Sequence, residues 1–168
     1  MTRLFSAVLF VMIGGACFAQ SPPLTRVSGL ETKVQNNPED LDSRTSLLNY
    51  YSLAQSSENY TRHVVWLIEN HPDYLAIDEY GRLLPEGGPL NTPSGYERAK
   101  AAWEAQLARP HNSGLVLLNA ANFLESSDPR RALELLEEGR KLDTEKRLYL
   151  GAEADIYKNA LVRYVGGI

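Results

Sequence analysis

Apolar residues recur at intervals of three and four positions along most of this chain, which is the spacing of one face of an α-helix. The clearest example is a pair of segments on either side of Asp128, whose inner positions are apolar or small: Val116, Ala120, Phe123, Ala132, Leu136 and Gly139. Asp128 is followed by Pro129, and an aspartate that caps a helix with a proline in its first turn is a typical helix start. Residues 114–142 are therefore predicted to form two helices that pack closely through their small residues.

The same spacing predicts further helices on both sides of this pair. A helix pair is expected within residues 41–72, and a short helix from about Arg26 to Gln35 is expected to cap it. The last helix, from about Lys146 to Val165, has apolar stripes on two opposite sides. One stripe is expected to face the other helices, and it consists of Leu150, Ala154, Tyr157 and Leu161. The other is expected to contact a further helix, a second copy or a partner, and it includes Leu148 and Ile156.

Residues 73–95 interrupt the helical pattern because they are rich in proline and glycine. This segment is expected to contain either a helix shortened to about Tyr74 to Leu84 or an extended loop, and to be separable from the rest of the fold. Ser94 and Glu97 match a capping box, so a helix is predicted to restart there and to run to Ala108. A long loop in a compact domain is often functional, and contact with a partner and a plain insertion are equal alternatives for it.

Residues that mark the ends of the predicted helix pairs are spaced by 34 positions from Pro38 to Pro72, by 38 from Pro72 to Pro110 and by 34 from Pro110 to Thr144. The spacing of 34 is the period of the tetratricopeptide repeat, a unit of two helices. The chain also resembles that family in its pairs of a small residue and a larger one, which are Ala99 with Trp103, Ala120 with Phe123, Ala132 with Leu136, and Ala154 with Tyr157. The resemblance implies an all-α fold, a right-handed α-solenoid of antiparallel helix pairs over residues 26–165, whose middle repeat is degenerate and interrupted by the loop.

The first residues have the pattern of a secretory signal peptide. Arg3 is followed by an unbroken apolar run from Ala7 to Ile13 and then by small residues. This pattern predicts a signal peptide at 1–19 and a mature chain that starts at Gln20. Residues 20–25 are then expected to be a flexible start of the mature chain.

Cys17 leaves a second interpretation of the leader open. Gly15, Ala16 and Cys17 resemble the end of a bacterial lipobox, in which the cysteine is lipidated and becomes the first mature residue. The protein is expected to be exported to the periplasm or the cell exterior, or alternatively to be lipid-anchored through Cys17. At the other end, residues 166–168 are expected to be a short tail.

Composition argues against several classes of partner and chemistry. The formal net charge is −4 and no cluster of lysines and arginines is present, so nucleic acid is not expected to bind. No apolar run beyond the leader is long enough to cross a bilayer. The 3 histidines lack the spacing of metal ligands, and no nucleophile or phosphate-binding motif is present. We therefore expect no cofactor, no metal and no enzymatic activity.

The resemblance implies that the chain is a scaffold for a protein or peptide partner in the cell envelope or periplasm, since the first helices of stacked repeats line a common surface. By analogy to the family, residues of the first and third repeats are expected to face this surface: Asp42, Thr45, Asn49, Ser52, Leu117, Ala121 and Leu124. Leu148 and Ile156 are further candidates, from the second stripe of the last helix. The alternatives are a structural subunit or a lipid-anchored assembly factor of an envelope complex, self-association and, least favoured, an enzyme.

Overall fold

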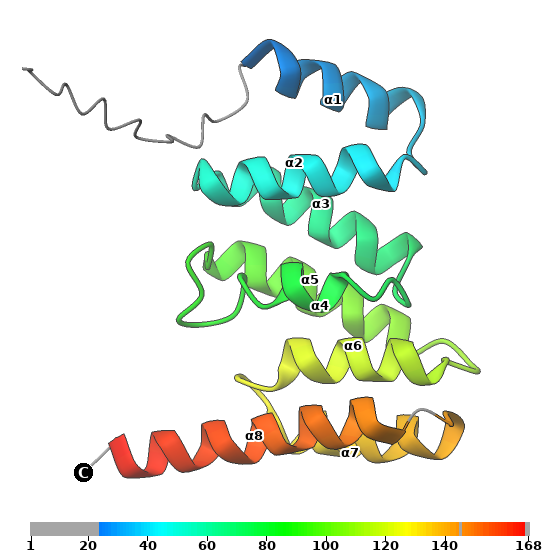
Figure 1. The fold of residues 1–168 in the computed structure, drawn as a ribbon, viewed down its shortest axis with the longest axis vertical. Helices are drawn as coiled ribbons and strands as arrows, with labels where there is room; N and C mark the ends of the chain where they lie inside the picture. The colour runs from blue at the N-terminus through cyan, green and yellow to red at the C-terminus, as the bar shows by residue number, and fades with distance from the viewer. Residues whose placement is uncertain (1–23, 145, 167–168) are drawn as a thin grey trace, which may run out of the picture.

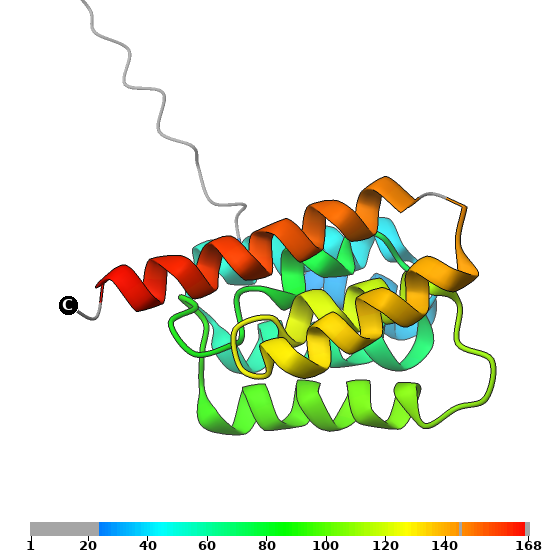
Figure 2. The same cartoon turned by 90° about the horizontal axis from the view of Figure 1, so that it is seen from below.

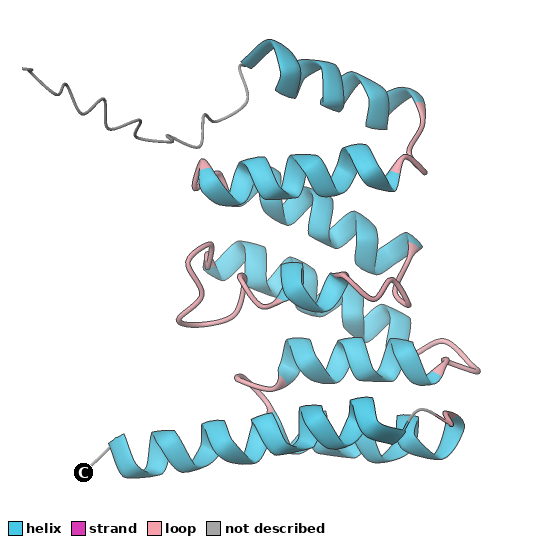
Figure 3. Ribbon diagram, in the orientation of Figure 1, coloured by secondary structure: helices cyan, strands magenta, loops and turns pink. Residues whose placement is uncertain are grey.

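The computed structural model describes residues 24–144 and 146–166, and over these ranges its secondary structure is helical, without a strand (Figure 3). The helices are α1 (Leu24–Asn36), α2 (Leu41–Leu53), α3 (Ser57–Asn70), α4 (Ile77–Gly81), α5 (Pro93–Leu107), α6 (Gly114–Leu124), α7 (Pro129–Leu142) and α8 (Lys146–Gly166). The all-α class predicted from the sequence is confirmed. The predicted signal peptide at 1–19, Cys17, the mature start at Gln20 and residues 167–168 lie outside the described residues.

The helices are stacked along the long axis of the molecule in chain order, from α1 at one end to α8 at the other (Figure 1). α2 and α4 lie in front of α3 and α5, and α8 lies in front of α7, so the stack has a front and a back. Seen along the stack, α8 and α5 lie at opposite edges of the molecule (Figure 2). Most contacts join helices that follow one another in the chain, but α3 also packs against α5, and α4 against α6. No described helix combines the length and the apolarity needed to cross a bilayer.

Four helices, α2, α5, α6 and α7, begin where a short polar side chain accepts a hydrogen bond from one of the first free amides. Asp128 accepts from the N–H of Arg131 at 3.0 Å, so the predicted start of α7 is confirmed. The start of α5 differs from the predicted one, because Thr92 rather than Ser94 is the cap and accepts from the N–H of Gly95 at 3.1 Å. Pro93 explains the difference, since its fixed φ angle suits the first helical position after Thr92.

The core is continuous through the stack, and α6 lies at its centre in the second half. α6 contacts α4, α5, α7 and α8, and all of its residues except Leu115 are buried. Gly114 of α6 and Gly139 of α7 lie against each other, since a Cβ atom on either one would lie 3.3 Å from the carbonyl oxygen of the other. The hydroxyl of Tyr149 lies against Gly114 and its ring against Gly139. A Cβ atom on Gly139 would lie only 2.6 Å from Cε1 of Tyr149. Of the small residues predicted at this helix contact, Gly139 is therefore required by the packing.

The interruption contains the short α4 and a loop that belongs to the core. Leu84 and Leu90 are fully buried, although they flank the turn at Gly87. The N–H of Leu90 donates to the carbonyl of Leu83 at 3.1 Å, and Nδ2 of Asn91 donates to the carbonyl of Leu84 at 2.6 Å. The expectation that this loop is separable from the fold is therefore wrong, because its leucines fill space between the helices.

α8 presents to the stack the side opposite to the predicted one. Tyr149, Ala152 and Ile156 are buried, whereas Leu150, Tyr157 and Leu161 are exposed. Tyr149 selects this side, since its ring fills the space beside Gly114 and Gly139 and its hydroxyl lies 3.0 Å from Oδ2 of Asp143. The prediction that Ile156 belongs to an exposed stripe is wrong, because that stripe forms the internal contact of α8.

Candidate partner-binding site

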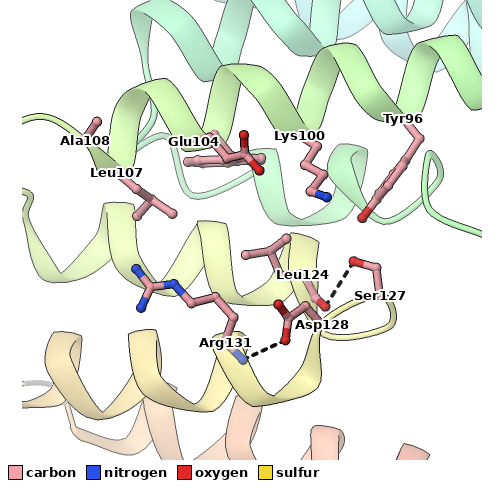
Figure 4. A pocket seen from close by; sticks show the side chains of 10 residues that line it. Tyr96, Lys100, Glu104, Leu107, Ala108, Leu124, Ser127, Asp128 and Arg131 are labelled. Carbon is pink, nitrogen blue, oxygen red and sulfur yellow. Dashed lines mark hydrogen bonds between the residues drawn. The ribbon is translucent and has the colours of Figure 1, made fainter.

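A groove on the back of the stack runs between α5 and α7 (Figure 4). It opens because α5 packs mainly against α3, while α7 packs mainly against α6 and α8. The groove contains a hollow of about 510 Å³ whose α5 wall includes Tyr96, Lys100 and Glu104. Leu124 at the end of α6 and Arg131 of α7 form the opposite wall. This volume is within the ~300–1,000 Å³ range of ligand-binding pockets.

The walls of this back groove combine apolar surface with charges of both signs. Trp103 lines it and is 2% exposed, and its indole N–H has no hydrogen-bond partner in the described part of the chain. Asp128 caps α7 at the rim, and Nη1 of Arg131 donates to Glu134 Oε2 at 3.1 Å. Apolar area with a few charged groups at the edge is typical of surfaces that bind polypeptides.

The back groove continues toward the other end of α7. A second hollow of about 420 Å³ shares Leu107 and Arg131 with the first, and adds Leu117, Leu135 and Leu142. Leu142 is exposed at its far end. The two hollows together follow most of the length of α7, so the groove suits an elongated segment better than a compact small molecule.

A smaller hollow, of about 160 Å³, lies on the front of the stack between α4, α6 and α8. Arg82, directly after α4, donates from Nε to Asp78 Oδ1 at 2.8 Å, with Nη2 3.2 Å from Oδ2. Asn119 of α6, Leu148 of α8 and Asp155 of α8 also line this front pocket. The lining is therefore mixed: it includes charged and amide side chains, the buried apolar residues Leu118 and Ala152, and the exposed Leu148.

The structure separates the residues that the sequence places on one partner-binding surface. Asp42 and Asn49 are exposed on α2, and Thr45 and Ser52 are half-buried there. Leu117, Ala121 and Leu124 are buried, and Leu117 and Leu124 border the back groove instead. The expectation that these three residues line an exposed surface together with those of α2 is wrong, because they are buried; the polar residues of α6, Asn119 and Asn122, lie on the opposite side of the helix.

The two candidates on α8 also lie apart. Leu148 is 45% exposed and lines the front pocket, whereas Ile156 is buried. The residues that line the front pocket on α6, Asn119 and Asn122, were not predicted as candidates. The signal for them is present in the sequence, since they are the polar residues of the otherwise apolar segment GLVLLNAANFL.

A polar cluster connects α1, α2 and α3 in the interior of the first half of the stack. Nη1 of Arg44 lies 3.1 Å from Nδ1 of His63, and Nη2 of Arg44 donates to the Pro38 carbonyl at 2.9 Å. The guanidinium also stacks 3.4 Å from the centroid of the Trp66 ring. Because a guanidinium only donates, Nδ1 of His63 must accept. His63 is therefore neutral and carries its proton on Nε2, which lies 3.2 Å from Glu31 Oε1.

Glu31 is the acceptor on which this cluster converges. Its Oε1 accepts from the Tyr51 hydroxyl at 2.6 Å and from Nη2 of Arg62 at 2.7 Å. Burial raises the pKa of Glu31, but the hydrogen bonds from Tyr51 and His63, with the charge of Arg62, outweigh burial and hold the pKa below its ordinary value. Burial and the bond to Glu31 raise the pKa of Tyr51 to about 12. The carboxylate is therefore ionised and the phenol neutral at physiological pH.

His63 and Glu31 have the residue types of an acid–base pair, but their surroundings assign them a structural role. Both ring nitrogens of His63 are engaged by Arg44 and Glu31, and the side chain is buried. No nitrogen is left to exchange a proton with a substrate. The cluster holds α1 against α2 and α3, and the sequence does not reveal it because His63 and Glu31 are 32 positions apart.

Lowering the pH is expected to destabilise the protein through His63. Burial lowers the pKa of His63 below 6.5, Arg62 and Arg44 lower it further, and Glu31 opposes them. The unfolded chain therefore binds this proton more readily, so the stabilisation is complete above pH 6.5 and is lost as the pH falls toward the lower pKa of the folded state. Glu31 adds a further loss at pH values below 4.5.

Urea unfolding on both sides of pH 6.5 measures this effect. The pH dependence should become shallower in His63→Gln, whereas His111→Gln, which changes an exposed histidine, should leave it as in the wild type. An unchanged pH dependence in His63→Gln would contradict the assignment of a neutral, buried His63.

Among the described residues, no group of three or more His, Cys, Asp or Glu side chains is placed to hold a metal ion. No protein family, curated protein or solved structure matches the chain.

Proposed function

We propose that this chain is an exported, non-enzymatic scaffold of the tetratricopeptide type, an α-solenoid that binds another protein in the cell envelope or periplasm. The observation that carries the proposal is the back groove, which is elongated, open to solvent and lined by apolar and charged side chains. Support for the repeat architecture comes from the stacking of the helices in chain order and from the spacing of 34 or 38 positions between the residues that mark the ends of the predicted helix pairs. Export follows from the pattern of the first residues.

In this groove, apolar side chains would supply the affinity for a partner, and charged side chains would orient it. Tyr96 and Leu107, which line the groove and are only partly buried, offer the apolar area from which most of the binding free energy of a polypeptide comes. Lys100 and Arg131 stand on opposite walls and would orient polar groups of the partner. A segment that is apolar on one side and polar on the other matches both features.

Site-specific photo-crosslinking in cells that export the protein tests this proposal. A photoreactive residue at position Lys100 is expected to give a discrete adduct with another polypeptide, because that side chain reaches over the groove. The same residue at Ala105, which is exposed on α5 but does not line the groove, is the matched control. The adduct at position 100 should be lost when Leu107 is changed to Asp. Equal adducts at both positions, or none at position 100, would contradict the proposal.

A second candidate function is a structural subunit or lipid-anchored assembly factor that packs permanently against a larger envelope complex. The observation that favours it is the outer side of α8, where apolar side chains are exposed together: Leu150, Tyr157, Leu161 and Val162. Contiguous exposed apolar surface of this kind marks sites of protein contact. Self-association through α8 belongs to the same class of explanation.

A further inference from the structure

The front pocket has three features that together select a positively charged ligand. The first is an excess of acidic side chains. Asp78 and Asp155 both line the pocket together with Arg82, and the charge of each helps to raise the pKa of the Arg82 guanidinium. Arg82 is held by two hydrogen bonds to Asp78, so it offsets one of these two carboxylates. A net negative potential is left at the pocket, which attracts a further cation.

The second feature is a buried acceptor that the protein itself does not satisfy. Asn119 is 1% exposed, and its Nδ2 donates to the carbonyls of Pro72 at 2.9 Å and Tyr74 at 3.3 Å. These two bonds engage the NH2 group of the side-chain amide and fix its orientation. Its Oδ1 has no hydrogen-bond partner in the described part of the chain, although the residue lines the pocket. A buried acceptor without a donor is unfavourable, so a ligand that brings donors is favoured over one that brings acceptors.

The third feature is an apolar entrance. Leu75, before α4, and Leu148, on α8, are both large, exposed residues that line the pocket, and they come from its two sides. Lysine and arginine carry their charge at the end of an aliphatic stem that packs well against such residues. The volume of about 160 Å³ holds roughly five water molecules at ~30 Å³ each, which suits the end of one long side chain and not a helix.

We propose that the front pocket binds a lysine or arginine side chain of a partner polypeptide, with its stem between Leu75 and Leu148 and its charged end beside Asp78, Asp155 and Asn119. This inference rests on the proposed function as a protein-binding scaffold and adds the chemistry of one contact. It uses the front of the stack, whereas the back groove lies on the other side. An acidic or C-terminal carboxylate group is excluded from the pocket by the same charges.

The test is an NMR titration of the full mature chain in about 0.15 M salt, where only short-range charge interactions persist. The probes are capped Leu-Lys-Leu, the matched peptides Leu-norleucine-Leu and Leu-Glu-Leu, and butylammonium as a free amine. Saturable shifts of the side-chain amide signals of Asn119 and Asn122 are expected with the lysine peptide. Much weaker shifts are expected with the other three. Equal shifts with norleucine would overturn the cation requirement, and equal affinity for butylammonium would overturn a polypeptide as the occupant.

Two substitutions on α8 test whether the NMR shifts come from binding in the front pocket. Asp155→Asn removes a carboxylate that lines it and is expected to weaken the lysine peptide roughly fivefold, the upper range for an exposed ion pair. Glu153→Gln makes the same change of charge on the same helix outside the pocket and should have no such effect. Equal weakening by both variants would show a nonspecific charge effect and overturn the site. If position 100 crosslinks to a partner but the lysine peptide causes no NMR shift, this inference is wrong and the proposed function still stands.

Discussion

Replacing Leu90 by alanine is expected to lower the free energy of unfolding by about 2–5 kcal/mol, the range for a large apolar residue removed from a core. Leu90 is only 1% exposed, although it lies in a loop between two glycines and Pro93. The backbone around it is fixed by the bond from its own N–H to Leu83, so the loop cannot simply collapse into the space that alanine leaves. Urea unfolding of the mature chain measures the change.

Leu75→Ala is the matched control for this experiment. It makes the same truncation in the same interruption of the helical pattern, but Leu75 is 61% exposed. Its effect is expected to stay within about 0.5 kcal/mol, as for most surface substitutions. If both substitutions lower the free energy of unfolding equally, or if Leu90→Ala hardly lowers it, the loop is separable from the core.

Local chemistry explains which parts of the fold could be predicted. The start of α7 at Asp128 and Pro129 depends only on neighbouring residues, and it is confirmed. The start of α5 was displaced because Thr92 and Ser94 are both suitable caps, and the proline between them decides in favour of Thr92. α1 begins at Leu24 rather than Arg26, which is within the usual disagreement about helix ends.

The side that a helix buries could not be predicted where both of its sides are apolar. In α8, the stripes with Leu150 and with Ile156 both have helical spacing, and the choice depends on the fit of Tyr149 beside Gly114 and Gly139. Those glycines lie on α6 and α7, so the deciding contact is remote in sequence. The placement of Leu117, Ala121 and Leu124 came from the analogy to the repeat family and not from the spacing of the apolar residues in α6.

The candidate sites were harder to predict than the helices because they are gaps between elements. The back groove exists because α5 packs against α3 more extensively than against α6. The sequence of α5 contains no signal that this helix packs against α3 in preference to α6. The front pocket could be predicted in part from the sequence, because Asn119 and Asn122 interrupt an apolar helix and Leu148 is a sequence-based candidate. Its acidic side chains come from α4 and α8, and only the fold brings them together.

Replacing Arg44 by methionine is expected to cost about 1–3 kcal/mol, because Nδ1 of His63, a buried acceptor, loses its donor at ~1–3 kcal/mol. The Pro38 carbonyl also loses its donor, but this bond is only part-buried and adds less, and the methionine regains some packing. The Trp66 ring also loses the guanidinium that covers it. Burial already lowers the pKa of Arg44 to about 10, against the charges of Glu31 and Glu39, so the protein holds this cation in an unfavourable place for the sake of its bonds.

Arg62→Met is the control, since Arg62 donates to the same cluster through Glu31 but its side chain is 52% exposed. Its loss is expected to cost no more than about 1 kcal/mol, as for surface ion pairs. The two variants should also differ in their response to pH. Both arginines lower the pKa of His63 through their charge, but only the loss of Arg44 also leaves Nδ1 of His63 free to take a proton. The pKa of His63 should therefore rise more in Arg44→Met than in Arg62→Met, and the loss of stability toward low pH should become shallower. If Arg44→Met unfolds no more easily than Arg62→Met, the guanidinium is dispensable and apolar packing alone holds α1 to the stack.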